Sequence, residues 1–153
     1  YAGYRWDNFT PIIGLGYRWL YDDSGGKTSS TGALGYDRQS QYFYVPTGGI
    51  FDLDRGIKIK GQFNYLIAGK QTSFLSDVEG FSDIENDQSS GWGVDITIDY
   101  KLTDNTSFYS FYRYWDIDKS DTSVGRFPGV LIFEAFEPAN KTTEAGIGFA
   151  YKF

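Results

Sequence analysis

The chain has 153 residues, a length that fits one domain, and it contains neither cysteine nor histidine. Disulfides and thiolate metal sites are therefore excluded, and the commonest metal ligand and proton shuttle is absent. The formal charge of −6 argues against nucleic acid as a partner, because phosphate binding needs a concentrated cationic surface.

Aromatic residues make up 20% of the chain, and it contains 19 glycines but only 4 prolines. Aromatic side chains favour strands, and glycine suits turns and crowded barrel interiors. No apolar run approaches the ~20 residues of a membrane-spanning helix, whereas a membrane β-strand needs only ~9–11 residues of alternating character. We therefore expect a single all-β domain over residues 1–153, and a membrane location stays open.

The first third of the chain predicts three strands. Residues 1–6 read as part of one strand, and residues 11–21 form a second with two distinct faces. One face of that second strand carries Ile13, Leu15, Tyr17, Trp19 and Tyr21, and the other carries Gly14, Gly16 and Arg18. Residues 39–51 form a third strand, but aromatic residues stand at both parities, so its facing stays open.

The central part predicts three more strands, over residues 57–70, 91–102 and 107–117. In the first of these, Ile57, Ile59, Phe63, Tyr65 and Ile67 oppose Lys58, Lys60, Gln62, Asn64 and Lys70. In the second, Trp92, Val94, Ile96, Ile98, Tyr100 and Leu102 oppose Gly93, Asp95, Thr97, Asp99 and Lys101. The third again has aromatic residues at both parities, and its facing stays open.

The last strand covers residues 142–153. Its apolar face carries Thr143, Ala145, Ile147, Phe149, Tyr151 and Phe153, and its small or polar face carries Thr142, Glu144, Gly146, Gly148, Ala150 and Lys152. The connections alternate between short turns at 7–10, 52–56 and 102–106 and long loops at 22–38, 71–90 and 118–141. Short turns at one end and long loops at the other are typical of an outer-membrane barrel.

Residue size indicates which face is inside. Small glycines suit the interior of a narrow barrel, and a continuous aromatic and aliphatic surface suits lipid. The inner face would then hold a paired network of Arg18, Lys58, Lys60 and Lys101 with Asp95, Asp99 and Glu144. The aromatic side chains near the strand ends would lie at the two membrane–water interfaces; they are Tyr17, Trp19, Tyr21, Trp92, Tyr100 and Tyr151. A soluble barrel shows the same alternation with the faces reversed, and it stays an alternative.

The ending GIGFAYKF at residues 146–153 resembles the terminal signal strand of bacterial outer-membrane proteins, with alternate aromatic residues and a final phenylalanine. The resemblance implies that Phe149, Tyr151 and Phe153 are the signal read by the barrel-assembly machinery. The whole chain resembles the small-barrel group that includes the OmpA membrane domain, OmpX and OmpW.

That resemblance implies a closed antiparallel up-and-down transmembrane β-barrel of about eight strands, about seven of them in this chain. It implies the outer membrane of a Gram-negative bacterium, with outer-membrane lipid and lipopolysaccharide around the barrel. The short turns would be periplasmic and the long loops extracellular. An even number of strands would then require one further N-terminal strand, before Tyr1.

No catalytic residue, cofactor site or metal site is predicted, and we expect that the protein is not an enzyme. Asp95 and Asp99 lie ~13 Å apart along one strand, which is too far for a glycosidase pair and favours structural charges. The loop at residues 77–87 holds five carboxylates, but their spacing does not match a calcium-binding EF-hand loop, which favours a solvated acidic loop.

The long loop at residues 118–141 is unusually apolar at its centre. The candidate partner-contact residues are Val130, Leu131, Ile132, Phe133 and Phe136. Two interpretations stay open: the loop folds over the barrel mouth and buries its own apolar side chains, or it binds another protein or a second copy.

These patterns favour a structural or interaction platform in the membrane that presents long extracellular loops. A barrel of about eight strands is filled by its own side chains, so it offers no wide aqueous channel. One alternative is a narrow porin-like channel for small solutes, which interior glycines would permit. Another is a soluble calycin-like barrel that binds an apolar ligand.

Overall fold

A computed structural model describes residues 2–126 and 132–152, and these residues form an all-β, antiparallel structure. The strands are β1 (Ala2–Gly3), β2 (Phe9–Ile13), β3 (Gly16–Asp22), β4 (Asp37–Leu53), β5 (Ile57–Phe74), β6 (Ile84–Asp87), β7 (Gly91–Lys101), β8 (Thr106–Ile117), β9 (Ser123–Arg126), β10 (Ile132–Ala135) and β11 (Asn140–Tyr151). Two short 3-10 turns, η1 (Asp54–Gly56) and η2 (Leu75–Asp77), follow β4 and β5. Neither turn is long or apolar enough to cross a membrane as a helix, and the described residues contain no other helical segment.

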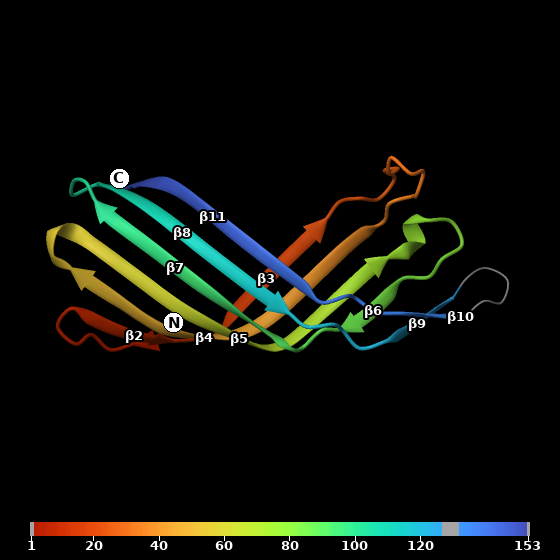
Figure 1. The fold of residues 1–153 in the computed structure, drawn as a ribbon, viewed down its shortest axis with the longest axis horizontal. Coiled ribbons are helices and arrows are strands. Elements are labelled where there is room, and N and C mark those ends of the chain that lie inside the picture. Colours follow the sequence, from red (N-terminus) through yellow and green to blue (C-terminus); the bar gives the residue numbers. More distant parts are fainter. Residues whose placement is uncertain (1, 127–131, 153) are drawn as a thin grey trace.

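The main sheet is a meander in which each long strand pairs with the next one along the chain. Its order is β1-β2-β4-β5-β7-β8-β11, with β3 also paired to β4 and β6 to β5. The short turns gather at one end of the molecule, and β6, β9 and β10 lie at the other (Figure 1). We call these the turn end and the loop end.

The number of strands differs from the prediction. The described residues contain eleven strands, whereas the sequence predicted about seven in this chain. One predicted strand is divided into β2 and β3 around Gly14 and Leu15, and both parts pair with β4 in the same register. Three short strands, β6, β9 and β10, lie in segments that were predicted to be loops.

No sheet closes into a barrel within residues 2–126 and 132–152. There β11 pairs only with β8, and β3 pairs only with β4, so each has one outer edge without a strand partner. Closure requires the first and last strands of a sheet to hydrogen-bond to each other, and β1 and β11 do not pair.

The predicted outward facing of the apolar side chains is confirmed. Ile96, Ile98, Phe149 and Tyr151 are all exposed, by between 42% and 71%. The opposite face is concave, because side chains from strands that are not neighbours meet on it: Arg18 of β3 contacts Glu144 of β11, and Tyr44 of β4 packs edge-on against Trp115 of β8. Large apolar side chains therefore cover the outside of the curled sheet, and its interior holds polar side chains together with some buried aromatic and aliphatic ones.

The facing of β4 and β8 follows from their register with glycines. Each inward-facing aromatic residue of these strands pairs directly with a glycine of a neighbouring strand, and a Cβ added to that glycine would overlap the ring. The pairs are Tyr42 with Gly69, Tyr44 with Gly16, Tyr109 with Gly148, Phe111 with Gly146, and Trp115 with Gly93. The rings fill the space that the interior glycines leave open.

The loop end is held together by hydrogen bonds between the segments that contain β6 and β9. The amide of Asp121 donates to the carbonyl of Asp87 at 2.9 Å, and the amide of Ser82 donates to the carbonyl of Arg126 at 3.3 Å. The hydroxyl of Ser123 also donates to the carbonyl of Glu85. Segments predicted to be loops are thus ordered, because their backbone polar groups find partners across the loop end.

Candidate functional site

An ion-pair network crosses the interior of the curled sheet. The Arg18 guanidinium donates to Oε1 of Glu144 at 2.9 Å, and Nη1 of Arg113 lies 3.6 Å from Oε2 of the same carboxylate. Nε of Arg113 also lies 3.3 Å from Asp95. The network links β3, β11, β8 and β7, so it spans the two open edges of the sheet.

Buried amides extend this network to β5. The side chain of Asn64 is fully buried, and its Nδ2 donates to Asp95 at 2.5 Å. Gln62, which is 5% exposed, donates to both Asn64 and Asp95. Buried polar groups need partners, and here each amide is bonded to the same carboxylate as Arg113.

The predicted internal charge network is confirmed for Arg18, Asp95 and Glu144. Arg113 was not predicted, because the facing of its strand stayed open. Phe111, two residues before Arg113, pairs with Gly146 on the inner face of β11. That glycine is the signal that could have placed both Phe111 and Arg113 inside. Nearer the turn end, charges pair differently: Lys58 with Asp52, and Lys101 with the turn residue Asp104. Asp99 accepts a hydrogen bond from Ser107 at 3.2 Å.

A cavity of about 230 Å³ adjoins the network, and we call it the chamber. Its lining includes Arg18, Lys60, Arg113, Asp95 and Glu144, so it contains three cationic and two anionic side chains. Thr97, Gln62, Tyr44 and Trp115 complete its inner wall.

Toward the loop end, an apolar cluster fills the interior next to the chamber. Tyr42, Leu66, Trp115 and Ile117 pack together and are at most 3% exposed; we call them the plug. A second cavity, of about 290 Å³, lies beyond the plug between Asp22, Arg38, Gln71 and Glu137. The order along β4 and β5 places the plug between the two cavities.

Gln88 ties the plug to the loop end. This side chain is 1% exposed; it accepts a hydrogen bond from the Tyr42 hydroxyl at 2.7 Å and donates to the carbonyl of Asp118 at 2.9 Å. A longer bond of 3.5 Å reaches the carbonyl of Pro138. One amide thus joins three segments across the interior.

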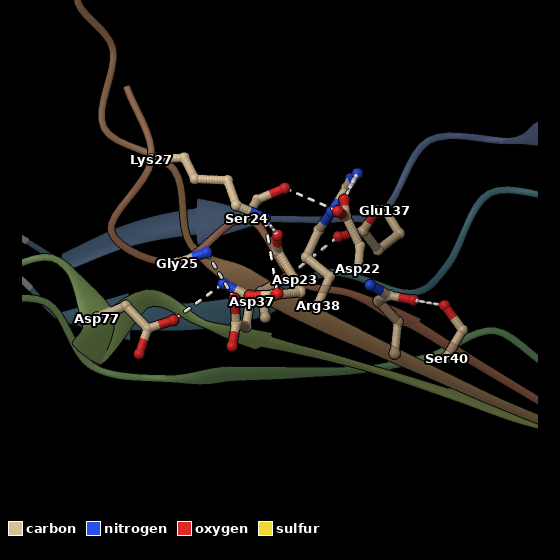
Figure 2. Close-up of polar contacts among 12 residues, drawn as sticks. Asp22, Asp23, Ser24, Gly25, Lys27, Asp37, Arg38, Ser40, Asp77 and Glu137 are labelled. Atoms are coloured by element: carbon tan, nitrogen blue, oxygen red, sulfur yellow. Dashed lines mark hydrogen bonds and ion pairs between the residues drawn. The ribbon is translucent and has the colours of Figure 1, made fainter. Parts of the chain in front are cut away.

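A polar cluster at the loop end joins the β3–β4 connection to η2. The Asp37 carboxylate accepts hydrogen bonds from the amide of Gly25 and the hydroxyl of Tyr21, both at 2.5 Å. Figure 2 shows Asp77 on the other side, where it accepts a hydrogen bond from the backbone amide of Asp37 at 2.9 Å. Arg38 forms an ion pair of 2.8 Å with Asp22.

These contacts shift the pKa values of Tyr21 and Asp37. The hydrogen bond to Asp37, with its nearby charge, raises the pKa of Tyr21 to about 12. The same hydrogen bond and the Gly25 amide lower the pKa of the Asp37 carboxyl below its ordinary value. Asp37 is therefore held in its charged form and Tyr21 in its neutral form.

Three of the five carboxylates of the acidic loop each have a different partner. Asp77 accepts from Asp37, Asp83 from the amide of Ser76, and Glu85 forms an ion pair of 2.5 Å with Lys70. Within the described residues, no group of three or more carboxylates is arranged to hold a metal ion.

The candidate partner-contact residues divide between two faces of β10. Ile132 is 69% exposed, whereas Phe133 packs edge-on against Phe81 and covers Gly125. Phe136 is half exposed under the ammonium group of Lys119, 3.7 Å from the ring centroid. Two further candidates, Val130 and Leu131, lie outside the described residues.

The predicted assembly-signal residues Phe149 and Tyr151 are exposed on the outer face of β11. Phe149 packs against Phe108 of the neighbouring strand, with 5.3 Å between ring centroids. The third signal residue, Phe153, lies outside the described residues. The predicted interfacial rings are all exposed on the outside: Tyr17, Trp19, Tyr21, Trp92, Tyr100 and Tyr151.

The outer apolar side chains form a band of limited height. The band runs from Ile57 to Ile67 on β5 and from Trp92 to Tyr100 on β7. On the loop-end side of the band, the same outer face carries two ion pairs, Lys70 with Glu85 and Lys141 with Asp116. The number of residues that each strand contributes to the band is close to the ~9–11 that a tilted membrane strand requires.

Comparison with known families finds no family model that matches this sequence, and comparison with curated proteins finds no match.

Proposed function

We propose that this protein is a β-barrel of the outer membrane of a Gram-negative bacterium, which acts as a structural or interaction platform. The observation that carries the proposal is the inverted distribution of side chains on the curled sheet. Ile147 and Phe149 are more than 70% exposed on the outside, while Asn64 and Gln62 are buried inside. A water-soluble sheet would bury the first pair and expose the second, so lipid is the solvent that fits the outer face.

Closure of the barrel is part of this proposal. A sheet edge in lipid leaves backbone N–H and C=O groups without partners, and each costs several kcal/mol. The outer edges of β3 and β11 are such edges, and the ion pair between Arg18 and Glu144 already joins their inner faces. We propose that backbone pairing covers these edges in the membrane and closes the sheet into a barrel of about eight strands.

A platform fits the interior better than a channel does. The interior glycines leave no open path where aromatic rings occupy their space, as Phe111 does over Gly146. The plug and the bonds of Gln88 also occupy the section between the two cavities. The ordered loop end, in turn, offers an exposed surface for a partner protein, with Ile132 and Val124 on the outside of the β9–β10 hairpin.

Tryptophan quenching by brominated lipid tests the membrane location. Trp92 and Trp115 lie at the same level of β7 and β8, because Gly93 pairs with Trp115, but Trp92 is exposed outside and Trp115 is buried inside. Variants that keep only one tryptophan, with phenylalanine at the other three, are folded into vesicles. We expect strong quenching of Trp92 and little quenching of Trp115.

Equal quenching of both tryptophans, or of neither, would contradict the assignment of the outer face to lipid. A third variant that keeps only Trp6 supplies a depth control. Trp6 lies in the turn-end hairpin before β2, outside the apolar band, so bromine near the bilayer centre should quench it weakly.

A further inference from the structure

We infer that the chamber contains a binding site for a small carboxylate, and that the side chain of Glu144 occupies this site in the structure. The inference concerns the interior of the sheet, so it does not depend on the proposed membrane location. It follows from how two arginines are held around one carboxylate.

The two arginines approach Glu144 from different strands and bind different oxygen atoms. Arg18 of β3 donates to Oε1 at 2.9 Å, and Arg113 of β8 lies 3.6 Å from Oε2. Guanidinium groups match the planar geometry of a carboxylate, and two of them complement both of its oxygens. The geometry is that of a carboxylate receptor.

Each arginine is also positioned by contacts that do not involve Glu144. The Arg18 guanidinium lies over the Trp115 ring, 5.1 Å from its centroid, and its side chain is 13% exposed. Arg113 is held by Asp95 at 3.3 Å and lies over the Phe111 ring, 4.7 Å from its centroid. The receptor should therefore keep its shape when the Glu144 carboxylate leaves.

Glu144 is the member of the network that can leave most easily. It belongs to β11, an outer strand of the sheet, and its side chain is 40% exposed, compared with 19% for Asp95. Asp95 is further fixed by two amide donors, Gln62 and Asn64. A carboxylate from solution would thus compete with Glu144 and not with Asp95.

The chamber has room and charge for such a ligand. Its volume is about 230 Å³, and three cationic side chains line it with two carboxylates. Without Glu144, the cations of the lining outnumber the anions by three to one. A small anion such as acetate would restore the missing negative charge between the arginines, as a buried cation requires.

Acetate rescue of a Glu144→Ala variant tests the inference. The folded protein, in detergent, carries Trp115 as its only tryptophan, so that its fluorescence reports on Arg18 over the ring. Sodium acetate is titrated against sodium chloride at constant ionic strength, and thermal unfolding is followed in parallel. We expect a saturable change with acetate in Glu144→Ala, an acetate Kd at least ~10-fold lower than in the unsubstituted protein, and a rise in Tm.

Asp116→Ala is the matched control, because it removes a carboxylate from an ion pair with Lys141 on the outer face. Acetate should leave its Tm and its Trp115 fluorescence unchanged relative to chloride. If acetate acts no better than chloride on Glu144→Ala, or acts equally on Asp116→Ala, the inference is wrong. Should the alanine variant fail to fold, Glu144→Ser, which also vacates the space between the arginines, is titrated under the same criteria.

Discussion

Arg18 and Glu144 stand 126 positions apart in the chain, yet their side chains form an ion pair of 2.9 Å. Arg18 lies on β3 and Glu144 on β11, the strands whose outer edges have no strand partner in the described residues. A side-chain contact across the interior therefore joins the two strands with open outer edges. The curl of the sheet depends on charged groups as well as on backbone pairing.

Replacing Ile96 by arginine tests the outer face. Ile96 lies in the middle of the apolar band on β7, and an arginine there should lower the free energy of unfolding in lipid by about 2–4 kcal/mol. Ile132→Arg is the control: Ile132 is more exposed, but it lies at the loop end beyond the band. Urea unfolding from vesicles measures both, and equal effects of the two substitutions would speak against the lipid assignment.

Gly146→Ala tests the packing of rings onto glycines. A Cβ at Gly146 would lie 2.7 Å from the Phe111 ring, so we expect a loss of about 1–3 kcal/mol of stability. Gly61→Ala is the matched control, because nothing lies within 4 Å of a Cβ at that position. Urea unfolding measures the stability of both variants, and Gly146→Ala should be the less stable one. Equal stability would mean that the Phe111 ring does not pack on Gly146.

Adjacent residues of β10 test how the loop end is stabilised. Phe133→Ser removes a ring that packs against Phe81, and it should lower stability by about 1–2 kcal/mol because the ring is only half buried. Ile132→Ser should change stability little, since Ile132 faces outward. If Ile132 also contacts a partner protein or a second copy of the chain, Ile132→Ser should weaken that association and Phe133→Ser should not. Analytical ultracentrifugation measures the association. Equal melting temperatures of the two variants would refute the assigned facing.

The hydrogen bond from Tyr21 to Asp37 predicts changes at both ends of the pH range. The raised pKa of Tyr21 means that its neutral form stabilises the fold below pH 10 and that this stabilisation is lost as the pH rises through about 12. The lowered pKa of Asp37 means that its charged form stabilises the fold above the ordinary carboxyl pKa and that this contribution is lost as the pH falls through the folded value.

Tyr21→Phe should therefore raise the pKa of Asp37 toward its ordinary value and remove one phenolate titration near pH 12. NMR titration of the Asp37 carboxyl carbon measures the first effect, and the difference in absorbance at high pH measures the second. Tyr4→Phe, at a tyrosine that is 71% exposed, is the control. An Asp37 titration that is the same in both variants would rule out the bond.

The alternation of residues predicted the long strands and their outer faces because it reflects a direct physical constraint: successive side chains of a strand point to opposite sides. It did not predict the facing of β4 and β8, where aromatic residues stand on both sides. There the information lies in pairs of strands, as with Trp115 and Gly93, and a single strand does not contain it.

Short strands could not be predicted for a different reason. β6, β9 and β10 are four residues long, too short for a periodic signal, and they are stabilised by contacts between distant segments such as Phe81 with Phe133. The chamber was predicted in part: Arg18, Asp95 and Glu144 were placed inside, but their meeting with Arg113 depends on the curl of the whole sheet.

The meander order also sets an expected sequence of folding events. Pairings between consecutive strands close short loops, and short loops cost the least chain entropy and form the fastest. Hairpins such as β4–β5 and β7–β8 should therefore form early, and the contact of Arg18 with Glu144 should form late, because it needs almost the whole chain in place. Substitution of Glu144 by alanine should therefore speed unfolding more than it slows folding, and stopped-flow fluorescence measures both rates.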